Sequence, residues 1–60
     1  MLFEYYDNYL RVTNYRQLKQ LESDNIVVDN LVINGLDLVI LSIDKDEIII
    51  KGIIYNLILR

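Results

Sequence analysis

The sequence predicts an all-β fold: a small antiparallel sheet or sandwich-like domain in which two long strands carry glycine bulges. The segments Leu31–Leu36 and Ile48–Ile53 both read as three aliphatic residues, a polar residue, a glycine and an aliphatic residue. Aliphatic runs alternate with short polar connections, and the chain contains no proline. A β-bulge inserts one extra residue into a period-two pattern, and glycine tolerates the backbone angles that a bulge requires.

Each of the two glycines marks a change in the strand face that we expect to be buried. Before Gly35 the inward positions are Leu31 and Ile33, and after it they are Leu36, Leu38 and Ile40. At Gly52 the inward positions pass from Ile48 and Ile50 to Ile53, Tyr55, Leu57 and Leu59. The pattern predicts that both glycines have a structural role and that the core consists of Leu38, Ile40, Ile50, Ile53, Tyr55 and Leu57.

The carboxy-terminal half shows the strand signals most clearly. The apolar runs Ile26–Val28 and Leu31–Ile33 flank Asp29 and Asn30, which favours a hairpin, with one continuous extended strand as the alternative. The polar segment Ser42–Glu47 is expected to connect two long strands, 35–43 and 48–59. These two strands should pair antiparallel as a second hairpin.

For residues 1–22 the sequence does not decide between helix and strand. Leu2, Tyr5, Tyr9 and Val12 lie at helical intervals, whereas Tyr9–Asn14 alternates and is rich in residues that favour extended structure. We favour a strand over the latter segment, with the first residues helical or frayed. Gln17–Glu22 fits a single helical turn or a short strand equally well.

Length and composition indicate one domain, residues 1–60, that needs support beyond its own core. A chain of this length buries only about 60% of its unfolded surface, and this one has no cysteine or histidine for disulfides or most metal sites. Association with other protein chains is the remaining source of stability. The chain begins without a signal-peptide pattern and has no apolar run near the ~20 residues that span a membrane, so we expect a cytoplasmic protein that does not span the membrane.

An enzyme is not expected, and we predict no catalytic, cofactor-binding or metal-binding residues. Asp44, Asp46 and Glu47 lack the spacing of a calcium loop, and no histidine is present to activate a serine or threonine. The net charge of −3 argues against nucleic acid as a partner. Three basic residues lie near tyrosines in the sequence, and we interpret them as a solvated surface: Arg11, Arg16 and Lys19.

Most of the side chains that alternate with the predicted core are also apolar, and the exceptions are Asn34, Asp37, Lys51 and Asn56. An antiparallel sheet with one face in water should instead show polar residues there. We therefore predict a homo-oligomer or a protein partner, with an interface of Val39, Leu41, Ile49, Ile54 and Ile58. The strand 48–59 is predicted to be an edge that only Lys51 protects, which favours edge pairing or sheet stacking.

Two further hypotheses remain open. The first is a binding module that holds a peptide or glycan ligand with a tyrosine-rich surface, formed by Tyr5, Tyr6, Tyr9 and Tyr15. The second is a stacking polymer akin to short β-solenoids, suggested by the 17-residue offset between the two glycines.

Four segments, in this order, cover most of the chain from about residue 10 onward: Val12–Leu18, Ile26–Val28, Leu31–Ile40 and Ile48–Leu57. In these segments the chain resembles the YabP/YqfC family of sporulation proteins, and the last two match the family's glycine-containing strands. It implies a small all-β, non-enzymatic protein of a spore-forming bacterium, made during sporulation. Such a protein acts in spore envelope assembly on the mother-cell side, where a protein partner at a membrane or the envelope is expected.

Overall fold

A computed structural model describes all 60 residues and contains six strands and no helix. The strands form one antiparallel sheet in the order β1-β2-β6-β5-β4-β3. Their bounds are β1 Leu2–Tyr6, β2 Tyr9–Thr13, β3 Leu18–Leu21, β4 Asn25–Val28, β5 Leu31–Ile43 and β6 Glu47–Leu59. The all-β prediction is confirmed.

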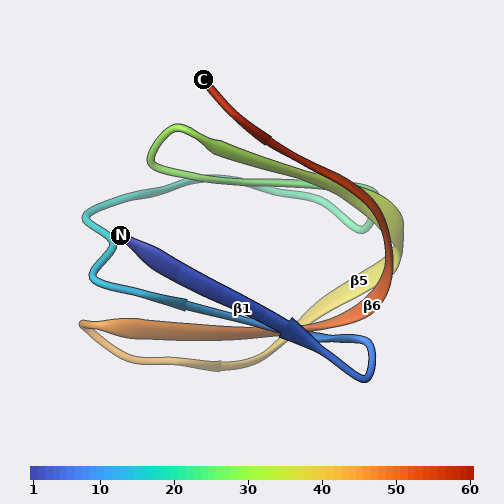
Figure 1. Cartoon of the computed structure of the whole chain (residues 1–60), viewed down its shortest axis with the longest axis horizontal. Coiled ribbons are helices and arrows are strands. Elements are labelled where there is room, and N and C mark those ends of the chain that lie inside the picture. Colours follow the sequence, from blue (N-terminus) through green and yellow to red (C-terminus); the bar gives the residue numbers. More distant parts are fainter.

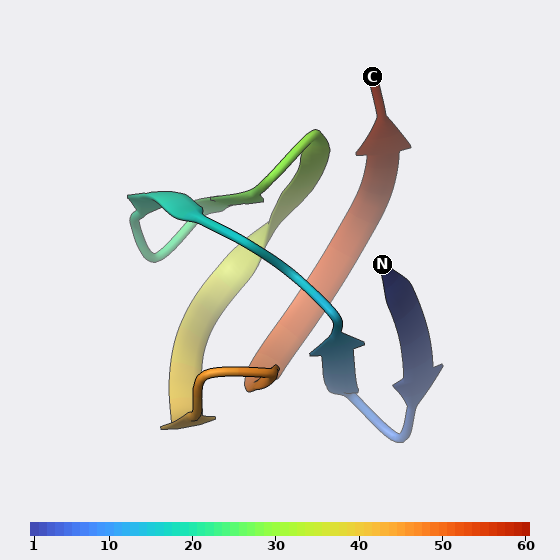
Figure 2. The same cartoon turned by 90° about the vertical axis from the view of Figure 1, so that its left-hand side faces the viewer.

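The sheet folds onto itself because β5 and β6 bend together near their midpoints (Figure 1). One layer contains β1, β2, the first half of β6 and the second half of β5. The other layer contains β3, β4, the first half of β5 and the second half of β6. Figure 2 shows the two long strands running side by side, with the β1–β2 hairpin and the β3–β4 pair on opposite sides of them.

Short turns fix the strand register. The Asp29-Asn30 hairpin is present, with Val28 opposite Leu31, and β5 and β6 pair antiparallel as expected. In the amino-terminal region, β1 and β2 form a hairpin across Asp7 and Asn8, both of which have positive φ. Asp and Asn tolerate this conformation better than other non-glycine residues, so the hairpin prevails over the helical spacing of the first residues.

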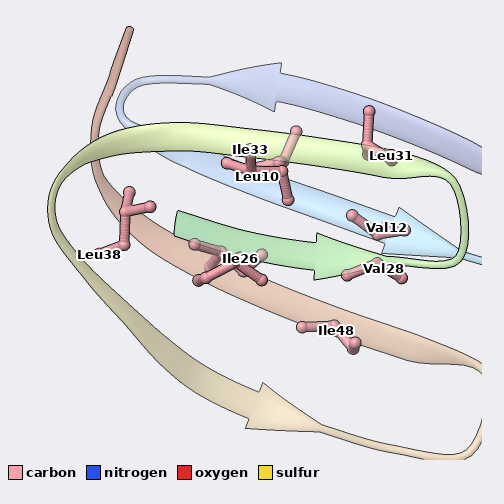
Figure 3. Close-up of a cluster of buried hydrophobic side chains, with 9 residues drawn as sticks. Leu10, Val12, Ile26, Val28, Leu31, Ile33, Leu38 and Ile48 are labelled. Carbon is pink, nitrogen blue, oxygen red and sulfur yellow. The ribbon is translucent and has the colours of Figure 1, made fainter. Parts of the chain in front are cut away.

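The core consists of two equivalent quartets of side chains, one from each layer. Leu10 and Val12 of β2 lie opposite Ile50 and Ile48 of β6, respectively. In the same way, Ile26 and Val28 of β4 lie opposite Ile33 and Leu31 of β5. All eight are fully buried and belong to one cluster that also includes Leu38 (Figure 3). The repeat seen in the sequence therefore corresponds to an approximate two-fold relation between the layers, in which β6 matches β5.

Three register shifts between β5 and β6 produce the bend. Tyr55 is an extra residue on β6 between two paired positions, and Leu41 is an extra residue on β5. Between these lies a third shift, where Asp37 and Leu38 of β5 occupy the space opposite a single β6 residue, Gly52. Asp37 takes the left-handed backbone conformation there, with φ of 55°. Bulges of this kind increase the local twist and bend a strand.

The two glycines are required by close backbone approach at this bend. A Cβ on Gly35 would lie 2.1 Å from the carbonyl oxygen of Ile53, and one on Gly52 would lie 2.8 Å from that of Asp37. Of the two glycines, only Gly52 has a positive φ, which is 149°. Each glycine also donates its N–H to a neighbouring turn, Gly35 to the Asp24 carbonyl and Gly52 to the Asn8 carbonyl, both at 3.1 Å.

The bulges, rather than the glycines, set the positions at which the buried face changes. On β6 the inward set continues past Gly52 to Ile54 and shifts only at Tyr55, after which Leu57 packs on the core. The prediction of an inward face is therefore wrong for Leu36, Ile53 and Tyr55, which are about half exposed or more, and Leu59 at the end of β6 is also 59% exposed. It is right for Leu38, Ile40, Ile50 and Leu57, which are buried or pack on the core.

Two statements about the predicted interface also need correction. Ile54 packs against the core cluster and therefore does not lie on the outer surface. The strand β6 is not an edge, because it lies between β2 and β5.

The total accessible surface of 4092 Å² is close to the roughly 4,100 Å² expected for a monomer of this mass. Association is therefore indicated by the composition of the surface and not by its area.

Candidate functional site

The fold leaves two outer faces, one on each layer, which we define by the side chains that alternate with the buried ones. The charged face belongs to the layer of β1 and β2 and includes Glu4, Tyr6, Tyr9, Arg11, Val39, Glu47, Ile49 and Lys51. The neutral face belongs to the layer of β3 and β4 and includes Gln20, Asn25, Val27, Val32, Asn34, Asn56 and Ile58.

On the charged face, Arg11 is held between two carboxylates. Its Nε donates to Glu47, and its Nη1 lies 3.4 Å from Glu4 Oε1. The hydrogen bond and charge of Glu47, with a smaller effect of Glu4, raise the pKa of Arg11. Lys51 Nζ lies 5.6 Å from the centroid of the Tyr9 ring, within cation–π range. The two acidic and two basic side chains of this face cancel in net charge.

Two shallow hollows lie on or beside the charged face. A groove of about 320 Å³ is lined by Glu4, Tyr6, Tyr9, Arg11 and Ile49. A second hollow of about 360 Å³ lies nearer the bend and is lined by Asn8, Asp37, Val39, Lys51, Gly52 and Ile53. Tyr6 and Tyr9 lie directly opposite each other on neighbouring strands, so their rings flank the groove together.

The structure brings together two of the four tyrosines proposed as a binding surface. Tyr5 pairs with buried Leu10 on the inward side of β1 and donates its hydroxyl to Asn8 Oδ1 at 3.1 Å. The Tyr15 ring packs against the core, and its hydroxyl donates to the Asp44 carbonyl. Only Tyr6 and Tyr9 contribute to an outer face.

The neutral face has an aliphatic row and an amide row. Val27, Val32 and Ile58 are aligned across three neighbouring strands, and Val32 is only 7% exposed although it points outward. Beside them Asn25, Asn34 and Asn56 are aligned in the same way. Asn34 Nδ2 donates to Asn56 Oδ1 at 2.8 Å, whereas Asn25 Oδ1 is buried without a partner. None of these seven side chains carries a charge, but Gln20 Nε2 at the β3 margin donates to the carboxylate of Glu22.

The residues predicted as an interface are divided among different surfaces. Val39 and Ile49 lie on the charged face, Ile58 lies on the neutral face, and Leu41 is exposed at the register shift between Ile40 and Ser42. The sequence reading missed the asparagine row. The Asp29-Asn30 hairpin offered a signal for it, because its two-residue turn alone aligns Asn25 with Asn34.

Asp29 organises the turn that lies at the end of the neutral layer. Its carboxylate accepts the N–H groups of Gln17 at 2.8 Å and Arg16 at 3.1 Å, and these bonds lower the pKa of Asp29, with the Gln17 bond dominant. Arg16, Gln17, Lys19, Asp29 and Asn30 line a wide depression of about 630 Å³. Arg11 lies on the charged face and not in this depression, so the three basic residues near the tyrosines do not form one patch.

The acidic segment before β6 forms a turn in which Asp44 N–H donates to the Glu47 carbonyl at 2.7 Å. No group of three or more His, Cys, Asp or Glu side chains is arranged to hold a metal ion. The chain also has no helix of the length and hydropathy needed to cross a membrane.

Comparisons with models of protein families, with curated proteins and with solved structures find no match to this chain. The resemblance to the YabP/YqfC family therefore stays a prediction, and the faces described above are the basis for a functional argument.

Proposed function

We propose that this chain is a non-enzymatic assembly subunit that associates with further copies of itself through the neutral face. The observation that carries the proposal is an outer sheet face with an aliphatic row and an amide row, both uncharged, and with the carboxylate of Glu22 only at its margin beside β3. Packing the uncharged rows of two copies together desolvates no charge, and burial of an unpaired charge is costly.

The sheet edges are less suited to association than this face. The two edge strands are β1 and β3, and each carries a charged residue, Glu4 and Lys19 respectively. β3 is also interrupted at Lys19, where the pairing register with β4 shifts. Charged residues and bulges on edge strands are the usual devices that prevent edge-to-edge pairing. Face stacking is therefore the favoured mode of assembly.

The amide row supplies polar specificity for such stacking. Asn56 is exposed and accepts the Asn34 amide through Oδ1, and its own Nδ2 group makes no hydrogen bond within the chain. The amide oxygen of an asparagine from a facing copy has the lone pairs that would accept this group.

The resemblance to the YabP/YqfC family supports a more specific proposal. A subunit of this kind would contribute to spore envelope assembly on the mother-cell side of a developing spore, by stacking with copies of itself or with a protein partner. Association would depend on contacts of the aliphatic row and not on any reactive group.

The test is light scattering over protein concentrations from about 10 μM to 1 mM, with circular dichroism on the same samples. The molecule has principal-axis extents of 24 × 21 × 17 Å, so one of its faces is smaller than the roughly 800 Å² that a standard interface buries per partner. The association should therefore be weak enough for the mass to rise with concentration. Ile58→Lys places a charge in the aliphatic row and should keep the chain monomeric with unchanged strand signal.

Ile53→Lys is the matched control. It changes another β6 isoleucine of similar exposure, 48% against 45% for Ile58, but at the bend and outside the neutral face. This variant should associate as the parent does. A parent chain that stays monomeric throughout the range contradicts the proposal, as does an equal loss of association in both variants.

A further inference from the structure

The groove on the charged face combines an aromatic wall with a polar wall. Tyr6 and Tyr9 form the aromatic side, with Tyr6 80% exposed, and Ile49 contributes the apolar floor. Directly opposed residues on antiparallel strands have Cβ atoms roughly 5 Å apart, so the two tyrosines lie side by side along the groove, with Lys51 Nζ 5.6 Å from the centroid of the Tyr9 ring. Tyrosine supplies such contact area at a low cost in conformational entropy.

The polar wall is pre-organised and still has unused hydrogen-bonding capacity. Arg11 uses Nε and Nη1 in its ion pairs, which leaves the Nη2 donors free. Glu4 accepts through Oε1, which leaves Oε2 free, and its side chain is 73% exposed. One donor group and one acceptor thus lie side by side on this wall, a pattern that matches a pair of neighbouring hydroxyl groups.

The charge of the groove excludes strongly ionic ligands. The positive charges of Arg11 and Lys51 are balanced by Glu4 and Glu47 on the same face, so the face offers no net attraction to phosphate or to a basic peptide. A neutral ligand with an apolar face and adjacent hydroxyls satisfies both walls at once. We propose that this groove binds a neutral β-linked oligosaccharide, whose sugar rings stack on Tyr6 and Tyr9 while its hydroxyls bond to Arg11 and Glu4.

The inference is independent of self-association. The groove and the neutral face lie on opposite layers of the folded sheet, so stacking through the neutral face leaves the groove open. An assembled subunit would therefore present its glycan site outward.

The test is a titration of uniformly ¹⁵N-labelled protein with cellohexaose, followed by heteronuclear NMR. Saturable shifts are expected for the amides of β1, β2 and the first half of β6, and not for those of β3 and β4. Tyr9→Ala removes half of the aromatic wall and should weaken binding by about tenfold, the equivalent of roughly 1.4 kcal/mol. Tyr55→Ala is the matched control, because Tyr55 is 64% exposed at the bend and lies outside the groove.

Three further measurements make the outcome decisive. The Ile58→Lys variant should bind cellohexaose as the parent does, which separates failure of the groove from failure of the assembly proposal. A single-stranded oligothymidine of 12 nucleotides should cause no saturable shifts. Absence of saturable shifts with cellohexaose at millimolar concentration overturns the proposal, as does equal weakening by Tyr55→Ala or preferential binding of the oligonucleotide.

Discussion

Substitution of Gly35 by alanine should destabilise the chain severely, although its backbone angles give no reason for glycine. Gly35 is not among the residues with positive φ. At such a position Gly→Ala normally stabilises a protein by about 0.4–1 kcal/mol, because it restricts the unfolded chain. Here the added Cβ would lie 2.1 Å from the Ile53 carbonyl oxygen and 3.1 Å from its carbon. Backbone atoms of β6 must therefore move by about 1 Å or more, at the point where the sheet folds over.

Forced overpacking of this kind costs about 1–3 kcal/mol, and displacement of backbone rather than of a flexible side chain places the cost at the upper end. We expect a loss of at least 2 kcal/mol from a total unfolding free energy of roughly 3–9 kcal/mol for a chain of this length. The melting temperature should fall by about 10 °C or more. Urea unfolding followed by circular dichroism measures the loss, in dilute solution so that association does not contribute.

Asp37→Gly is the control for this experiment. It introduces a glycine into the same bend at a residue that already has φ of 55°, so the backbone strain relieved and the entropy added should nearly cancel. A change within about 0.5 kcal/mol is expected. If Gly35→Ala were neutral or stabilising, the close approach of β5 and β6 would not exist as described.

Three other changes test separate parts of the structure. Gly52→Val should lower the melting temperature by more than Gly35→Ala does, because it combines a positive φ with contact to the Asp37 carbonyl and a β-branched side chain. Ile54→Lys should lower stability by about 2 kcal/mol or more in urea titrations even in dilute monomer, because Ile54 packs on the core, whereas an unchanged value would restore Ile54 to the surface. The pKa of Asp29 is lowered in the folded state, so its contribution to stability is present above about pH 4 and is lost as the pH falls through the folded value. Asp29→Asn should therefore be less stable than the parent at pH 7, and urea midpoints measured down to pH 2 should converge; a gap that does not narrow would contradict the assigned hydrogen bonds.

The sequence was sufficient to predict those parts of the fold that depend on local chemistry. The aliphatic runs, the Asp29-Asn30 turn and the charged segment before β6 led to the correct strands in the carboxy-terminal half. Positions beyond the bend were less predictable, because a bulge can occur at any residue that tolerates its angles. The change of face was expected at Gly35, but the left-handed residue of the β5 bulge is Asp37, and this moved the change of face by a few residues.

Strand order also depended on information that periodicity does not contain. β2 pairs with β6 through contacts between residues far apart in the sequence, so β6 was taken for an edge although it is central. The same pairing decides which outward residues form one surface. It places Tyr9 beside Lys51 and Arg11 beside Ile49, and no pattern within either segment indicates these neighbours.

The two layers place different chemistry on equivalent positions. The β2–β6 pair can be matched to the β4–β5 pair through their buried quartets. In this match Arg11 of β2 corresponds to Val27 of β4, and Lys51 of β6 corresponds to Asn34 of β5. The inward positions of both layers are all aliphatic, because each quartet fills half of the same core. The outward positions are free of that constraint, and they differ in charge and aromatic content. A chain of 60 residues with one shared core can thus offer two chemically distinct outer surfaces, and this difference between the faces is the physical basis for assigning association to one and ligand binding to the other.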